Sequence, residues 1–203
     1  EGCECWIFID LASKLDIAAK IYVFARGENY YVFGQYYLPE DAIESGNPNY
    51  DFYSGWSREK RLTLTPGNVI DFEFIEQDLI EDCKRFDVRH IGFDPWQATE
   101  LSTRMMAEGL PMIEFPMTVK RISEPMKNLE ALILQKRIQH PRDPVLDWMM
   151  SNVEAKIDAK ENVFPRKARP ENKIDGAISL IAALGLAMLR EEQATPGVRW
   201  LTA

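Results

Sequence analysis

The chain has 203 residues, of which 46% are hydrophobic and 28% charged, a profile typical of one globular domain with a sizeable buried core. This composition excludes a fibrous or disordered protein, and no apolar run reaches the roughly 18 residues that a membrane span needs, so we expect no membrane partner. Three cysteines cannot all pair with one another and only two histidines are present, so neither a disulfide framework nor a zinc site is favoured.

The acidic and basic residues are unevenly distributed along the chain. The formal net charge is −8, which taken alone argues against a nucleic-acid partner. Residues 1–110 hold 10 Lys and Arg against 20 Asp and Glu, whereas residues 120–173 hold 12 against 8. A polyanion would therefore be held by the second half, while the acidic half could supply metal ligands. An acidic surface without functional meaning explains the charge equally well.

Three apolar and aromatic runs at residues 5–10, 18–25 and 30–37 predict strands, and a turn with Gly27 joins the second to the third. We expect these strands to form an antiparallel meander. Residues 39–67, rich in Pro and Gly, predict an irregular excursion with a short helix near residues 40–44, which we interpret as a lid or partner surface.

The second half of the chain alternates helical and strand patterns. The expected elements are a helix at 71–86, a strand at 88–94, a helix at 97–108, a strand at 112–115, a helix at 123–134 with Pro125 in its first turn, a short helix at 143–150, a hairpin over 153–158 and 162–166, and a final helix at 174–189. This order predicts an α/β fold, with a mixed β-sheet flanked by helices in a single domain. We expect residues 191–203 to be a flexible tail. The abrupt start of the chain suggests a piece of a longer protein.

Three aspartates are candidate metal ligands. Asp10 and Asp94 each end an apolar strand, and Asp175 lies in the first turn of the last helix, beside Gly176. Strand ends that meet water and an ordinary helix cap would explain them without a site. If the two strands are neighbours, however, their carboxylates emerge side by side and repel unless a cation or proton lies between them.

An oxygen-only site of this kind suits Mg²⁺ or Mn²⁺, and two such ions about 4 Å apart can drive phosphodiester hydrolysis. The sequence contains no GxxxxGK[ST], GxGxxG, GxSxG or HExxH motif. Carboxylate–metal chemistry, or no chemistry at all, is what remains.

Several segments resemble the nuclease domain of large terminase subunits from tailed bacteriophages. They are FIDLAS at 8–13, IGFDPWQA at 91–98 and NKIDGA at 172–177, with TPGN at 65–68, SEPMKNLE at 123–130 and DPVLDW at 143–148 between them. Each motif is short, but their order and spacing cover nearly the whole chain. The resemblance implies a ribonuclease-H-like fold, and it implies endonucleolytic cutting of concatemeric double-stranded DNA during genome packaging, with Mg²⁺ or Mn²⁺ and two ions in the site.

The same resemblance implies roles for individual residues and partners. Asp10, Asp94 and Asp175 fall where the family has its metal-binding aspartates, and Asp16 matches a further acidic position of some members. It also implies an N-terminal ATPase domain, absent here, in the full-length chain, a portal and a small terminase subunit as partners, and the cytoplasm of the infected host as location.

Four basic residues are candidates for DNA binding: Lys173, Arg166, Lys167 and Arg169, the last three expected in a Pro-bounded loop. Each could equally be an ordinary surface cation. Two rival functions stay open, a junction resolvase or transposase-type nuclease of the same fold, and a non-catalytic docking module of the packaging machine.

Overall fold

The structure, a computed structural model, describes residues 3–11, 16–44, 46–96 and 99–194. The strands are β1 (Glu4–Asp10), β2 (Ala18–Arg26), β3 (Asn29–Pro39), β4 (Thr63–Thr65), β5 (Asp87–Phe93), β6 (Met112–Glu114), β7 (Ile138–Gln139), β8 (Val153–Ile157) and β9 (Val163–Lys167). The helices are α1 (Tyr50–Arg58), α2 (Phe72–Arg85), α3 (Thr99–Ala107), α4 (Val119–Leu134), α5 (Pro144–Ser151) and α6 (Asp175–Ala194), with a 3-10 turn η1 (Glu40–Ala42).

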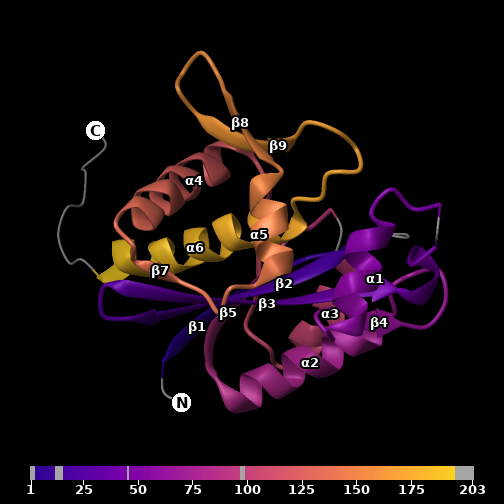
Figure 1. Ribbon diagram of the computed structural model, residues 1–203. Helices are drawn as coiled ribbons and strands as arrows, with labels where there is room; N and C mark the ends of the chain where they lie inside the picture. Colours follow the sequence, from indigo (N-terminus) through magenta and orange to yellow (C-terminus); the bar gives the residue numbers. More distant parts are fainter. Residues whose placement is uncertain (1–2, 12–15, 45, 97–98, 195–203) are drawn as a thin grey trace.

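The centre of the molecule is a mixed sheet with the strand order β4-β3-β2-β1-β5-β6, and β7 adds to β3 (Figure 1). β1 pairs antiparallel with β2 and parallel with β5, and the last pair of the parallel ladder joins Ile9 to Phe93. These two strands therefore finish at the same edge of the sheet. The expected mixed sheet flanked by helices is confirmed.

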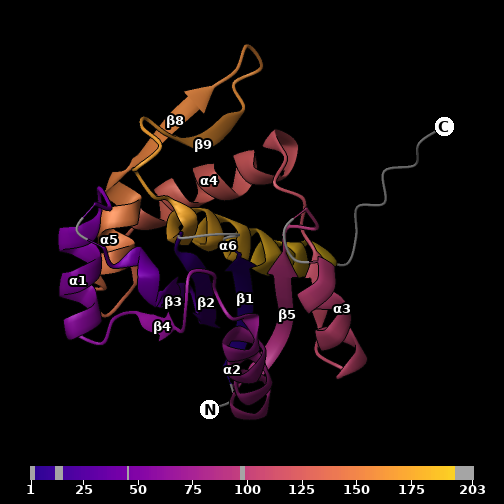
Figure 2. The same ribbon diagram turned by 90° about the vertical axis from the view of Figure 1, so that its right-hand side faces the viewer.

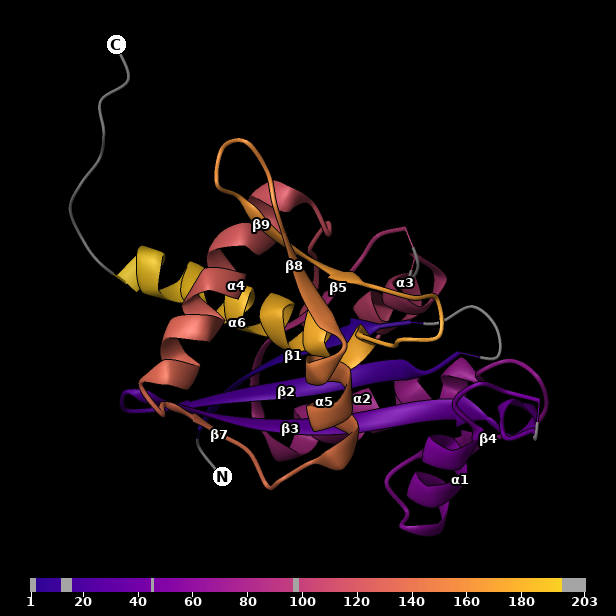
Figure 3. The same ribbon diagram turned by 45° about the horizontal axis from the view of Figure 1, so that its top comes forward.

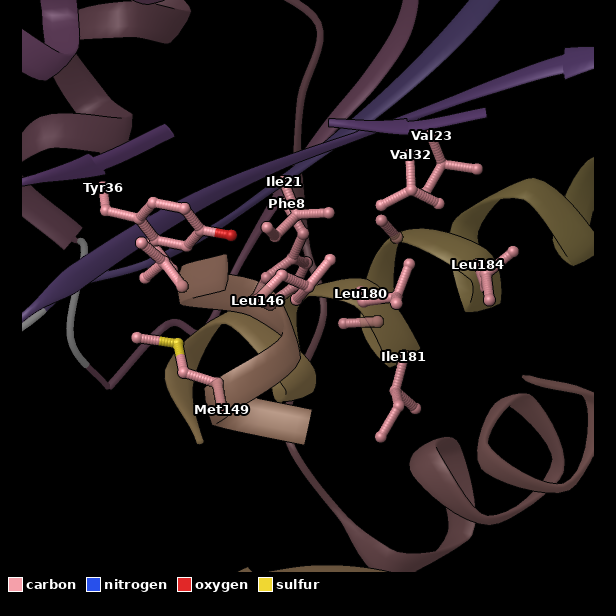
Figure 4. Packing of buried hydrophobic residues seen from close by; sticks show 14 of the residues in the cluster. Phe8, Ile21, Val23, Val32, Tyr36, Leu146, Met149, Leu180, Ile181 and Leu184 are labelled. Carbon is pink, nitrogen blue, oxygen red and sulfur yellow. The ribbon is translucent and has the colours of Figure 1, made fainter. Parts of the chain in front are cut away.

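Helices cover both faces of the sheet: α4, α5 and α6 lie on one side, and α2 and α3 on the other (Figures 1 and 2). Successive residues of a strand point to opposite faces, so Phe8 packs in the core beneath α6, whereas Ile7 and Ile9 pack in the core on the α2 side. Burial on both faces explains why β1 is a continuous apolar run. Leu180 and Leu184 of α6 belong to the same core as apolar side chains of β1, β2 and β3 (Figure 4).

A buried ion network holds α2 on its face of the sheet. Lys20 of β2 is only 1% exposed, and its Nζ lies 2.7 Å from an Asp82 carboxylate oxygen and 4.0 Å from one of Asp78. The hydroxyl of Tyr22 donates to Asp82 and that of Tyr37 to Asp78, over 2.8 and 2.6 Å. The buried charge of Lys20 is thus matched by carboxylates that are themselves hydrogen-bonded, which is the condition for tolerating it.

Residues 39–67 are more regular than the sequence predicts. The short helix near residue 40 is confirmed as η1, but the segment also contains α1 and β4. Tyr53 and Trp56 are buried on one side of α1, and Trp56 packs edge-on against Trp148 of α5 with ring centroids 5.3 Å apart. Tertiary burial of these aromatics stabilises a helix whose own sequence favours it poorly.

The helix expected at 123–134 begins earlier, at Val119, so the prediction of Pro125 in its first turn is wrong. Pro125 lies inside α4, against α6 at Gly185, where a Cβ would come within 2.9 Å of the proline ring. Close helix packing thus accommodates a residue that cannot donate the usual backbone hydrogen bond.

The last helix runs beyond the predicted limit of residue 189, to Ala194. Residues 191–194, expected in a tail, are helical, and residues 195–203 lie outside the described part, as do residues 97–98 at the predicted start of α3. The predicted hairpin is confirmed as β8 and β9, which project from the body beyond α4 (Figure 3). Within the described ranges, no helix is long and apolar enough to cross a membrane.

Candidate metal centre

The ends of β1 and β5 position two of the predicted aspartates. Asp10 is the last residue of β1, and Asp94 follows directly after β5. Phe8 and Gly92, two residues earlier, both lie on the α6 side, where a Cβ on Gly92 would meet Phe8 and Leu186. Strand alternation therefore directs both carboxylates toward the α6 side of the same edge.

Asp175 reaches this edge from the first turn of α6. The residue is partly exposed, but its Oδ2 is buried and has no hydrogen-bond partner among the described residues. A glycine such as Gly176, next to it, can leave room for a ligand or for another backbone. The space is taken instead by Met149 of α5, whose Sδ accepts a hydrogen bond from the Gly176 amide and would lie 2.8 Å from a Cβ at that position.

The ionisation of these acids indicates that they lie close together. Burial raises the pKa of Asp10 well above its usual range, and the negative charges of Asp175 and Asp94 raise it further. Burial, followed by the charge of Asp16, raises the pKa of Asp175 to about 6. Carboxylates that hinder one another's ionisation in this way favour a cation between them.

Asp16 and Lys173 form an ion pair at the margin of this cluster. The Lys173 ammonium lies 2.8 Å from Oδ2 of Asp16, and the two side chains are 15% and 33% exposed. The other oxygen of Asp16 accepts a hydrogen bond from the Ile17 amide over 2.9 Å. Asp16 therefore faces the cluster but is already partly neutralised.

The donor set fits a hard divalent cation. All the candidate ligands are carboxylate oxygens, which Mg²⁺ and Mn²⁺ prefer, and the buried Oδ2 of Asp175 lacks the partner that a buried polar atom requires. Within the described residues, no three His, Cys, Asp or Glu side chains already stand at the spacing of a metal site. Mutual repulsion opposes such close spacing until a cation compensates it.

Two of the four basic candidates lie beside the carboxylates. The positive charge of Lys167 lowers the pKa of both Asp10 and Asp175, and Lys173 lowers that of Asp175. Arg166 instead pairs with Glu154 on the neighbouring strand over 3.0 Å. The predicted Pro-bounded loop is wrong for Arg166 and Lys167, because both belong to β9; Arg169 follows that strand.

Tyr53 is a neighbour of the cluster that the sequence did not suggest. Burial raises the pKa of its hydroxyl above the usual range, and the charges of Asp16 and Asp175 act in the same direction. Asn49, just before α1, donates from its amide to the Glu171 carbonyl over 2.9 Å and so ties this helix to the segment before Lys173. No local pattern could predict this proximity, because these residues are far apart in the sequence.

Comparisons with known proteins agree with this architecture. The family model described as the terminase large subunit, endonuclease domain, matches residues 1–191. Protein YmfN of Escherichia coli (strain K12) is 34% identical over 207 residues, covering 96% of this chain and 46% of that protein. The large terminase subunit of Enterobacteria phage HK97 is 28% identical over 183 residues, covering 88% of this chain and 36% of its own length.

Solved structures give the same result. The crystal structure of the HK97 large terminase superposes with a TM-score of 0.79 at 27% identity, over 92% of this chain and 40% of that one. A structure of the large terminase nuclease from thermophilic phage G20c, with bound magnesium, shares the fold with a TM-score of 0.53 at 12% identity, over 90% of this chain and 81% of that one. The chain spans less than half the length of the curated relatives it matches.

Proposed function

This chain belongs to the family of terminase large-subunit endonuclease domains, and we propose that it is a metal-dependent endonuclease that cuts concatemeric double-stranded DNA during phage genome packaging. The observation that carries the proposal is the convergence of Asp10, Asp94 and Asp175. Asp10 ends β1, Asp94 follows β5 and Asp175 lies in the first turn of α6, and burial together with the charges of neighbouring acids raises the pKa of Asp10 and Asp175. A purely structural role gives no reason to place half-buried acids near one another at this cost.

We propose that Asp10, Asp94 and Asp175 hold Mg²⁺ or Mn²⁺, in a site for two ions, with Asp16 as a further ligand. Support comes from the oxygen-only donor set and from the related fold solved with bound magnesium. When bound, such a pair of ions activates a water and stabilises the leaving oxygen of a phosphodiester. The carboxylates supply the fixed negative charge that keeps the ions at the sheet edge.

The basic residues would bind and orient the DNA. Lys167 and Lys173 lie beside the carboxylates, where an ammonium group can neutralise a phosphate near the cut. Arg166 and Arg169, further along the same segment, would follow the DNA backbone. With a net charge of −8 for the whole chain, such a small basic patch should bind weakly and with strong salt dependence.

The remaining affinity would come from partners. We propose that the domain acts within a longer chain that carries a terminase ATPase domain, together with the portal and the small terminase subunit, in the cytoplasm of the infected host. The lengths of its relatives support a longer chain, because this one covers only 46% and 36% of them.

A plasmid assay tests the proposed chemistry. Wild-type chain with Mn²⁺ should nick and linearise supercoiled plasmid, and Asp94→Asn should lose most of this activity, because it removes one of the charged groups proposed to hold the ions. Glu81→Gln is the matched control, because Glu81 is 71% exposed on α2, on the other face of the sheet. Its activity should equal that of the wild type.

The rival functions predict other outcomes in the same assay. A junction resolvase or transposase-type nuclease would cut branched DNA in preference to plasmid. A non-catalytic docking module would give no metal-dependent cleavage and no difference between wild type and Asp94→Asn, which would refute the proposal.

A further inference from the structure

Trp96 exposes its indole to an unusual degree. The side chain is 91% exposed, the largest value among the large hydrophobic residues that the structure describes; Leu134 follows with 76%. Tryptophan is highly buried on average, because its large apolar surface is costly to leave in water. The four other tryptophans of the sequence include Trp6 and Trp56, which are buried in the core. The position of Trp96 therefore calls for a binding partner.

A hydrogen bond constrains the turn that carries this indole. The Trp96 amide donates to Oδ1 of Asp94 over 3.2 Å, which closes an Asx turn directly after β5. Pro95, between the two residues, fixes its own φ and restricts the backbone of Asp94 as well. The backbone of Asp94 and Pro95 is therefore restricted, which limits the range of positions that the indole of Trp96 can take.

This placement puts Trp96 inside the footprint of any DNA that reaches the metal centre. Two residues span at most about 7 Å along the chain, so the Trp96 backbone lies within that distance of Asp94. Successive phosphates of one strand of duplex DNA are spaced about 3.4 Å apart along the helix axis, and lie further apart than this along the strand itself. If Asp94 holds a metal at the cut phosphate, Trp96 lies within about two nucleotides of it.

We propose that Trp96 stacks on a nucleobase next to the phosphodiester that is cut, and so gives the site a preference for DNA in which that base is unpaired or easily unstacked. This inference rests on the proposed function of the same centre. An indole carries no charge to attract a phosphate, whereas every base offers an aromatic face on which it can stack. In an intact duplex those faces are covered by neighbouring bases, so stacking requires that a base be displaced, which is easiest at mismatches and pyrimidine–purine steps.

Binding without cleavage tests the stacking directly. The 203-residue chain in EDTA is titrated with two labelled duplexes, one fully paired and one with a single unpaired 2-aminopurine, and anisotropy is measured at several salt concentrations. Trp96→Ala should bind the second duplex about tenfold more weakly than wild type, as loss of one base stack predicts, and the fully paired duplex less than threefold more weakly. The slope of log K against log salt should not change, since no phosphate contact is lost.

Two further readouts make the result specific. Wild type should quench the 2-aminopurine emission, Trp96→Ala should not, and Trp96→Phe should retain part of the quenching and affinity. Leu134→Ala on α4 is the control for loss of an exposed apolar side chain and should behave as wild type. Trp96→Ala should melt at the wild-type temperature, since the removed side chain is 91% exposed.

The proposal is overturned if Trp96→Ala binds both duplexes as wild type does. It is equally overturned if that variant changes only the self-association of the chain in sedimentation, which would assign Trp96 to a protein contact. These outcomes are separate from the failure of the proposed nuclease activity. A chain that cuts plasmid but does not quench the probe refutes stacking alone, whereas a chain that quenches the probe but never cuts refutes the nuclease alone.

Discussion

Replacing Asp175 by Asn should stabilise the protein in the absence of metal. The pKa of the Asp175 carboxyl in the folded chain is about 6, against roughly 3.9 in an unfolded chain. Each unit of difference corresponds to about 1.4 kcal/mol, so at neutral pH the ionised carboxylate costs the fold about 3 kcal/mol. Asn removes this charge and keeps a side chain that can cap α6. The raised pKa already includes the interaction of the carboxylate with the helix dipole, so the expected gain is about 3 kcal/mol.

The direction of the pH dependence follows from the raised pKa. Protonated Asp175 is the form that the fold favours, so its contribution is complete below about pH 4 and is lost as pH rises through about 6. Asp175→Asn should therefore resemble wild type at pH 4.5 and exceed it at pH 7.5. For a chain of this size, about 3 kcal/mol corresponds to a rise of roughly 6–12 °C in Tm.

Urea unfolding in EDTA, followed by tryptophan fluorescence at both pH values, measures this difference. Glu81→Gln removes an exposed carboxylate on the other face of the sheet and should show no such gap. An Asp175→Asn chain that is no more stable than wild type at pH 7.5, or that shows the same gap at both pH values, would refute the reasoning. The carboxylate would then be better solvated than its surroundings indicate.

Three further changes test the acidic cluster, the proposed metal site and the buried ion pair. Asp10→Ala should leave the fold intact and raise the metal-free Tm, because it relieves repulsion within the acidic cluster; a marked fall in Tm would make Asp10 a structural residue. Mn²⁺ at a hundredfold excess over its Kd should stabilise wild type by about 2.7 kcal/mol in thermal melts, but not Asp10→Ala, and an equal shift in both would place the ion elsewhere. Asp82→Asn should cost about 3 kcal/mol in urea unfolding, since only Asp78, 4.0 Å away, would still face the buried Lys20; a loss below about 1 kcal/mol would contradict a need for the pair.

The sequence predicts the elements whose patterns are local and the acids that end them. β1 is a continuous apolar run and β5 becomes apolar toward its end, and both stop at a carboxylate, so both strands and the positions of Asp10 and Asp94 follow from the pattern alone. Their parallel pairing, which brings the acids together, is a contact between distant segments and had to come from the fold or from a resemblance. The match of the family model to residues 1–191 bears out that resemblance.

What the sequence could not predict depends on tertiary contacts. α1 contains Ser, Gly and aromatic residues with little helical tendency of their own, and it forms because its aromatic side packs against Trp148. Lys20 lies at a buried position of β2, where a lysine is tolerated only if an acidic side chain pairs with it. That side chain, Asp82, comes from α2, which is distant in the sequence. The proximity of Tyr53 to Asp16 is likewise a contact between distant segments, which no local pattern predicts.

The last helix has a consequence for when activity can arise. α6 supplies a large share of the core beneath the sheet and also carries Asp175, the final member of the proposed centre. A ribosome releases α6 after all the strands described here, so a chain whose synthesis has not yet reached α6 has neither a closed core nor a third carboxylate. Completion of the fold and completion of the centre are then one event. A growing chain would therefore stay inactive toward DNA until α6 has been synthesised and has packed on the sheet.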